Sequence, residues 1–259
     1  MTRPREELAA RGRLAARELL RKRQIRAVEE IDLLAIAWHE GVEVRFGGLA
    51  GARGRLTKKG SRGIVRVADR ISEEAQQRFV IAHELGHHLM HSVPGAISLC
   101  SDRDLTDYAP RSKETEANVF AAELLMPRFL FEPRCDVREP NLDVVLEIGT
   151  SFRTTITATA LRFVELCPEP CALVWCEGGV IRWAFRGPEF SPWISSGRRL
   201  DGQSHAHDAF LGQELPKKPE LVPLSAWADG GSRDVMEHTL YFTSLRATLT
   251  LLWLPSNEG

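Results

Sequence analysis

The chain has 259 residues, of which 43% are hydrophobic, and its formal net charge is −1. This length allows one large domain or two smaller ones, and the near-zero charge excludes a global field that draws the chain to nucleic acid or to a membrane. No apolar stretch reaches the roughly 18 residues that a membrane span needs, and residues 1–7 lack the apolar core of a signal peptide. The composition therefore predicts a cytoplasmic chain without a membrane segment, whose five cysteines are reduced thiols.

The first 30 residues predict an amphipathic helix. They are rich in arginine with interspersed glutamates, and their apolar side chains fall on one stripe, formed by Leu8, Ala15, Leu19 and Leu20. Such a helix either packs through this stripe, which is the commoner arrangement, or presents its basic face to an acidic partner or to nucleic acid.

A glycine-rich sheet region follows. Asp32 predicts the N-cap of a helix that ends at Gly41, and residues 42–46 and 64–67 predict short strands. Beside an active site, an exposed edge strand can hold an extended peptide by main-chain pairing. We expect some strand within residues 54–67 to have that role.

The next segment contains the motif His-Glu-x-x-His in a helical context. His83 and His87 lie one turn apart on one face, about 6 Å along the helix axis, so both imidazoles can bind one ion. Glu84 lies about 100° round the helix from His83, where a carboxylate can take a proton from water, as the base of a metalloprotease does. Ser72 is the expected cap of this helix. The alternative interpretation is a surface stripe of His and Glu on an ordinary core helix.

A catalytic zinc needs a third protein ligand, and a second helix, stopped at Met126-Pro127, offers one. Glu114 shares its face of this helix with small apolar residues, so its carboxylate points inward, where a cation would offset the cost of burial. Glu116 lies about 200° away and belongs to another side with Glu123. The alternative for Glu114 is a solvated carboxylate near a helix start.

Further side chains around these helices are weaker candidates. Tyr108, in the polar loop 96–112, can donate a hydrogen bond to the oxyanion of a tetrahedral intermediate or lie at the surface. His88 and His91 have the same two interpretations. His91 lies about 12 Å along the axis from His83, too far to bind the same ion.

The segment from His83 to His88 and the segment from Glu114 to Pro127 resemble the two signatures of the ImmA/IrrE metallopeptidases. That family is similar to the gluzincins, in which a Glu on a second helix completes the metal site. The resemblance covers about residues 30–130. It implies a zincin-like domain with the metal on His83, His87 and Glu114, and with Glu84 as the base. Asn118 matches the polar residue that accompanies the third ligand, and Asn118, Tyr108 and His88 are the supporting candidates.

After Pro127 the sequence predicts a short helix over 142–148, ended by a glycine, and a longer helix over 154–166. Two such helices are typical of a helix-turn-helix. Only Arg153 and Arg162 are basic there, so a structural or partner-binding module is favoured over a DNA-binding one.

The last third of the chain predicts a sheet. Strands are expected over 172–176, 180–185, 221–227, 236–242 and 247–254. Glu177-Gly178-Gly179 predicts a hairpin turn between the first two strands. The spacing of Cys167 and Cys171 is not the C-x-x-C of a metal site, so buried thiols are favoured. No side chains here indicate a chemical function, and sensing or substrate selection is expected from position alone.

The sequence therefore predicts an α+β protein in three parts: a zinc metallopeptidase domain over 1–130, a helix-turn-helix-like module over 131–168, and a small α+β domain over 169–259. The predicted activity is that of an endopeptidase with Zn²⁺, or another divalent metal such as Mn²⁺, as cofactor.

The resemblance also implies a partner. It suggests a protein substrate, a helix-turn-helix repressor, whose cleavage switches on genes of a stress response or a mobile element. The alternative is a regulator that binds DNA or a repressor through residues 142–166 without cutting it, with a structural metal site.

Overall fold

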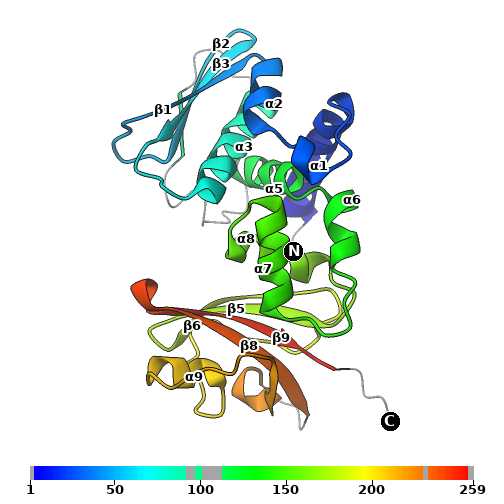
Figure 1. Ribbon diagram of the computed structural model, residues 1–259, viewed down its shortest axis with the longest axis vertical. Coiled ribbons are helices and arrows are strands. Elements are labelled where there is room, and N and C mark those ends of the chain that lie inside the picture. The colour runs from blue at the N-terminus through cyan, green and yellow to red at the C-terminus, as the bar shows by residue number, and fades with distance from the viewer. Residues whose placement is uncertain (1–2, 92–96, 101–112, 230–232, 256–259) are drawn as a thin grey trace. The chain divides into compact units, whose positions relative to one another are not determined.

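The computed structural model describes residues 3–91, 97–100, 113–229 and 233–255 (Figure 1). The fold is α+β, as predicted, with two small sheets. No helix in these ranges combines the length and the apolar character needed to cross a lipid bilayer.

The chain divides into two compact units. The first contains Met1–Phe131 together with Ser151–Thr155, and the second contains Glu132–Thr150 together with Ile156–Gly259. The three-part division, in which residues 131–168 form a separate module, stays a prediction.

The first unit combines a four-stranded sheet with helices. Its main elements are α1 (Arg3–Lys22), α2 (Leu33–His39), β1 (Val42–Gly47), β2 (Gly54–Lys59), β3 (Arg62–Ala68), α3 (Glu74–Met90), β4 (Ile97–Cys100), α5 (Lys113–Leu125) and α6 (Arg128–Phe131). The strand order is β1-β3-β2-β4, in which β1 and β3 are parallel and the other two pairs are antiparallel.

The edges of this sheet differ from our expectation. The prediction of a substrate-binding edge strand within residues 54–67 is wrong, because β2 and β3 each have a neighbouring strand on both sides. In the part of the chain that the structure describes, the edge strands are β1 and β4. The reason is that β4, which comes from residues 97–100, pairs with β2 and covers its second side.

Helix α1 packs on α5 through a stripe of small and apolar residues (Figure 1). The buried positions of α1 are Ala9, Gly12, Ala16, Leu19 and Leu20. A Cβ atom added to Gly12 would lie 2.5 Å from the backbone oxygen of Glu116. The backbones of α1 and α5 therefore approach each other directly at this point, with no side chain between them. The packed arrangement of the N-terminal helix is therefore the one that the fold adopts.

Helix α3 lies against both the sheet and α5. It begins at Glu74, and the N-cap position is held by Glu73 without a side-chain cap, so the expected cap at Ser72 is wrong. The ring of Phe120 from α5 lies directly on Gly86, where an added Cβ atom would be 2.9 Å from the ring. Gly86 thus allows the close approach of α3 and α5.

The second unit contains an antiparallel five-stranded sheet of order β6-β5-β9-β8-β7. Its main elements are α7 (Leu142–Phe152), α8 (Ile156–Leu166), β5 (Cys171–Glu177), β6 (Val180–Arg186), α9 (His205–Phe210), β7 (Glu220–Pro223), β8 (Asp234–Phe242) and β9 (Ala247–Trp253). The predicted hairpin turn is present, and both Gly178 and Gly179 have positive φ angles, as a two-residue turn of this kind requires.

Two boundaries in this unit differ from the prediction. The strand expected over 221–227 ends at Pro223 and continues as a single turn of helix over Leu224–Ala226. Helix α7 does not end at Gly149 but continues to Phe152. Gly149 lies on the buried side of α7, so packing of that side outweighs the low helix propensity of glycine.

The four cysteines whose side chains are described are buried thiols: Cys135, Cys167, Cys171 and Cys176. Burial raises the pKa of the Cys135 and Cys176 thiols to about 12, which makes both unreactive. These thiols belong to the core.

The contact at Gly12 leads to a stability prediction. Glycine to alanine in a helix normally stabilises by about 1 kcal/mol. At Gly12 the added methyl group meets the backbone of α5, so we expect Gly12→Ala to lower the free energy of unfolding by about 1–3 kcal/mol. The control is Ala10→Gly on the exposed side of α1, which measures the effect of helix propensity on the free energy of unfolding without any contact to α5. A more stable Gly12→Ala protein in urea unfolding would show that α1 does not press on α5.

A second prediction concerns the pH dependence of stability. Burial favours the neutral form of Glu40, but hydrogen bonds and charges from Lys22 and Arg23 outweigh it and hold the pKa of Glu40 below its usual value. The resulting stabilisation is complete above the ordinary carboxyl pKa and is lost as the pH falls through the lowered pKa. We expect Glu40→Gln to cost about 1 kcal/mol at pH 7 and nothing measurable near pH 2.

The matched control is Glu43→Gln, which breaks an exposed pair with Arg45. Chemical unfolding of both variants at several pH values measures the difference. A cost of Glu40→Gln that is the same at pH 7 and pH 2 would contradict the role of the ionised carboxylate.

Candidate metal centre

Helix α3 carries the His-Glu-x-x-His motif into the interior of the first unit. His83 and Glu84 have no exposed surface, and His87 and His88 are each 5% exposed. The helix is buried on several sides here because the sheet covers one side and α5 another. The surface-stripe interpretation is therefore excluded by the fold, and these polar side chains need partners inside the protein.

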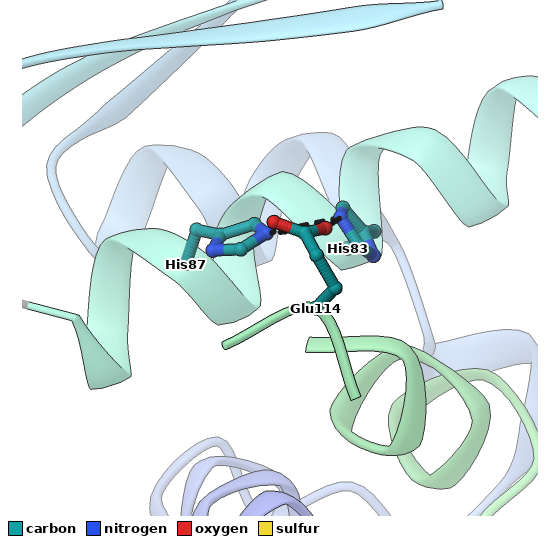
Figure 2. Close-up of side chains that lie close together, drawn as sticks. All are labelled: His83, His87 and Glu114. Carbon is teal, nitrogen blue, oxygen red and sulfur yellow. Dashed lines mark hydrogen bonds and ion pairs between the residues drawn. The ribbon is translucent and has the colours of Figure 1, made fainter. Parts of the chain in front are cut away.

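Three predicted side chains meet between α3 and α5 (Figure 2). The Oε2 atom of Glu114 lies 3.1 Å from Nε2 of His83 and 3.2 Å from Nε2 of His87. The two Nε2 atoms are 3.0 Å apart. One ligand atom from each residue can therefore reach a common point, with all three within 4.8 Å of one another.

The tautomer of His83 follows from the contact that its second ring nitrogen, Nδ1, makes. Nδ1 of His83 lies 2.8 Å from Oδ1 of Asn118, one turn after Glu114 on α5. A carboxamide oxygen only accepts, so Nδ1 carries the proton and Nε2 presents a lone pair to Glu114 and His87. Burial lowers the pKa of His83, which keeps the ring neutral, as a metal ligand must be.

Glu114 supplies the negative charge of the group. Its Oε2 atom faces the lone pairs of the two Nε2 atoms, so the three atoms together favour a bound cation. Its side chain is 26% exposed, so the group is reachable from outside on the side of Glu114.

Glu84 lies next to this group. Both carboxylate oxygens are buried, and neither makes a hydrogen bond in the described part of the chain. Gly54 of β2 makes room for the carboxylate, since an added Cβ atom there would lie 2.8 Å from Oε1 of Glu84. Burial, with a contribution from the charge of Glu114, raises the pKa of Glu84 to about 8.

The donor set fits a divalent cation. Two neutral imidazoles and a carboxylate are the ligands of a catalytic zinc site that keeps a fourth position for water. A cation among three electron-pair donors would remove their mutual repulsion, and it would stabilise the ionised form of the buried Glu84.

The other sequence candidates lie in different surroundings. His88 is buried against the sheet at Gly63, where an added Cβ atom would lie 2.9 Å from its Nδ1, and it is not part of the three-residue group. Tyr108 lies outside the described residues. Asn118 contacts His83, as described above.

Sequence reasoning did not predict the contact of His91 with the buried Glu116 beside the group. His91 lies with its Nδ1 atom 2.9 Å from Nδ1 of His87, and its Nε2 atom lies 2.7 Å from Oε2 of Glu116. Glu116 is 3% exposed. The fourth-residue spacing of His87 and His91 indicates that these rings are neighbours, but from the sequence we considered His91 only as an oxyanion donor or a surface residue and excluded it as a ligand of the same ion.

Comparison with known proteins adds a family and a fold. Residues 39–163 match the family model Peptidase_M78, described as the IrrE N-terminal-like domain. None of the curated proteins matches the chain. A solved structure described as a Mycobacterium tuberculosis transcriptional regulator is similar with a TM-score of 0.55 and 16% sequence identity, and the match covers 98% of this chain and 81% of that one.

At this identity the solved structure is informative about the fold alone. The family match includes all three residues of the metal group and Glu84, and it confirms the resemblance that the two motifs indicated. Residues 39–163 of this chain are therefore similar to the IrrE N-terminal-like domain.

Proposed function

We propose that this chain is a metal-dependent endopeptidase that uses Zn²⁺, with Mn²⁺ as the alternative ion. The observation that carries the proposal is the meeting of three electron-pair donors, His83, His87 and Glu114, beside the carboxylate of Glu84, which has no hydrogen-bond partner among the described residues. The match of residues 39–163 to a peptidase family model supports the same reaction class.

The proposed chemistry divides between the ion and Glu84. A bound divalent ion would supply Lewis acidity, lowering the pKa of a water and polarising the scissile carbonyl. Glu84 accepts the proton of the attacking water at a carboxylate oxygen and then donates it to the nitrogen of the leaving amine. His83, His87 and Glu114 would hold the ion, and Asn118 fixes the ring of His83 by accepting a hydrogen bond from its Nδ1–H group.

The sheet offers a place for an extended substrate. Cys100 of β4 pairs with Gly54 of β2, and Gly54 packs on Glu84. Neighbouring strands lie about 4.8 Å apart, so β4 is one strand away from the proposed base. Among the described residues β4 pairs with β2 alone, and its second side is available for main-chain pairing with a peptide.

For the substrate we propose a DNA-binding repressor of the helix-turn-helix type, cleaved to switch on the genes that it controls. The motifs of the ImmA/IrrE metallopeptidases in this sequence support this class.

Direct DNA binding through residues 142–166 receives less support. Arg162 of α8 is 5% exposed and forms an ion pair with Glu165, so it is not available to a phosphate. Arg153, between α7 and α8, contacts Glu74. The alternative of a non-cleaving regulator thus depends on protein contacts, and the first variant below separates it from the enzyme.

We expect Glu84→Gln to reduce cleavage of a repressor encoded beside this chain at least about 100-fold, because the amide cannot accept the proton of water. Binding of Zn²⁺ should survive, since the three ligands are unchanged. Glu74→Gln, in the exposed first turn of α3, is the matched control and should cleave normally. Cleavage is followed by gel electrophoresis and mass spectrometry. A Glu84→Gln protein that cuts at the normal rate would reject the enzyme assignment.

Replacement of the third ligand, Glu114, should weaken metal binding and leave the protein folded. We expect Glu114→Gln to weaken Zn²⁺ binding more than about 100-fold, because a charged ligand is replaced by a neutral amide. Zn²⁺ should raise the Tm of the unaltered protein and of Lys113→Ala, the neighbouring exposed position, but not that of Glu114→Gln. Chelator competition and thermal unfolding measure both effects. Equal Zn²⁺ affinity of all three proteins would show that the ion binds elsewhere.

A further inference from the structure

A chain of hydrogen bonds leads away from the metal group through residues that no part of the proposed mechanism uses. Nδ1 of His87 lies 2.9 Å from Nδ1 of His91, and Nε2 of His91 lies 2.7 Å from Oε2 of Glu116. The other carboxylate oxygen of Glu116 forms an ion pair with Arg11 of α1, at 2.8 Å. Three helices therefore contribute to one line of contacts: α3, α5 and α1.

The direction of the hydrogen bonds is set at the far end of this line. Glu116 is 3% exposed and has a cation on one oxygen, so its other oxygen acts as an acceptor. Nε2 of His91 then donates to Glu116, which leaves Nδ1 of His91 as an acceptor. Nδ1–H of His87 therefore donates its hydrogen bond to Nδ1 of His91. The remaining nitrogen of His87, Nε2, is left with its lone pair toward Glu114 and His83.

Hydrogen bonds in the opposite direction, from His91 to His87, are incompatible with a metal ion at this site. If Nδ1 of His91 donated to His87, then Nε2 of His87 would carry the proton and could not bind an ion. It would also require a hydrogen on the carboxylate of Glu116, beside Arg11. The contacts therefore select one tautomer of His87.

We infer that His91 and Glu116 are positioning residues for the metal centre, which hold His87 in the tautomer and ring orientation that bind the ion, and that Arg11 extends this support to the N-terminal helix. This inference rests on the metal site of the proposed function. It gives the two ligand histidines separate supports, Asn118 for His83 and the His91–Glu116 pair for His87. Partners of this kind typically change metal affinity about 10-fold to 100-fold when they are removed.

The first test compares two substitutions of His91 in the full chain. His91→Leu introduces an apolar side chain of similar size that cannot accept a hydrogen bond. In His91→Gln, the side-chain oxygen can still accept a hydrogen bond from Nδ1 of His87. We expect His91→Leu to weaken Zn²⁺ binding about 10-fold to 100-fold, and His91→Gln to recover most of the loss. Competition with a chromogenic chelator gives the affinity, and circular dichroism of the metal-free proteins shows that they are folded.

The second test uses two arginines of α1 that form parallel ion pairs with α5. Arg11 pairs with Glu116, while Arg17 pairs with Glu123, away from the histidines. Both arginines are largely exposed, so either change should leave the protein folded. We expect Arg11→Ala to weaken Zn²⁺ binding about twofold to fivefold and Arg17→Ala to leave it unchanged.

The outcomes distinguish the two proposals. If the unaltered chain binds no Zn²⁺, the proposed function fails and this inference fails with it. If the unaltered chain binds Zn²⁺ but His91→Leu binds it equally well, the metal site stands and the positioning role of His91 is rejected. If Arg11→Ala and Arg17→Ala have the same affinity, the support does not extend to α1.

Discussion

The structure of the first unit depends on one electrostatic constraint: three electron-pair donors face one another between α3 and α5, and only Glu114 among them is more than 5% exposed. His83 and His87 present lone pairs rather than protons, because each has its second nitrogen engaged with an acceptor. Facing donors of this kind repel one another unless a positive charge lies between them. The packing of α3 on α5 is what holds these atoms together, and it is possible because the ring of Phe120 lies on Gly86 without an intervening side chain.

Glu84 shows a second consequence of the same packing. Its carboxylate lies in a space made by Gly54 of β2 and has no hydrogen-bond partner in the described ranges. A buried carboxylate of this kind is costly when ionised, and burial accordingly raises the pKa of Glu84 to about 8. A nearby cation has the opposite effect and favours the ionised form. The ability of Glu84 to act as a base is therefore tied to occupation of the neighbouring site, so the charge of the ion and the basicity of the carboxylate belong to one system.

The sequence was informative wherever a feature depends on residues that are close together in the chain. Helical spacing was sufficient to place His83, Glu84 and His87, and the turn glycines predicted the hairpin at Gly178. It was uninformative where the outcome depends on which elements become neighbours. The edge of the sheet could not be found, since the partner on the second side of β2 comes from residues 97–100. The pairing of His91 with Glu116 depends on the register between α3 and α5, and no spacing within either helix reveals it.

The N-terminal helix illustrates how a segment outside the matched family region can influence the site. Residues 39–163 match the family, whereas α1 spans Arg3–Lys22. Gly12 brings α1 close to the backbone of α5, and this approach places Arg11 on the carboxylate of Glu116. Since Glu116 is buried, an ion pair on one of its oxygens changes the strength with which the other oxygen holds His91. A change in the packing of α1 would thus reach His87 through two hydrogen bonds, without any contact between α1 and the ion.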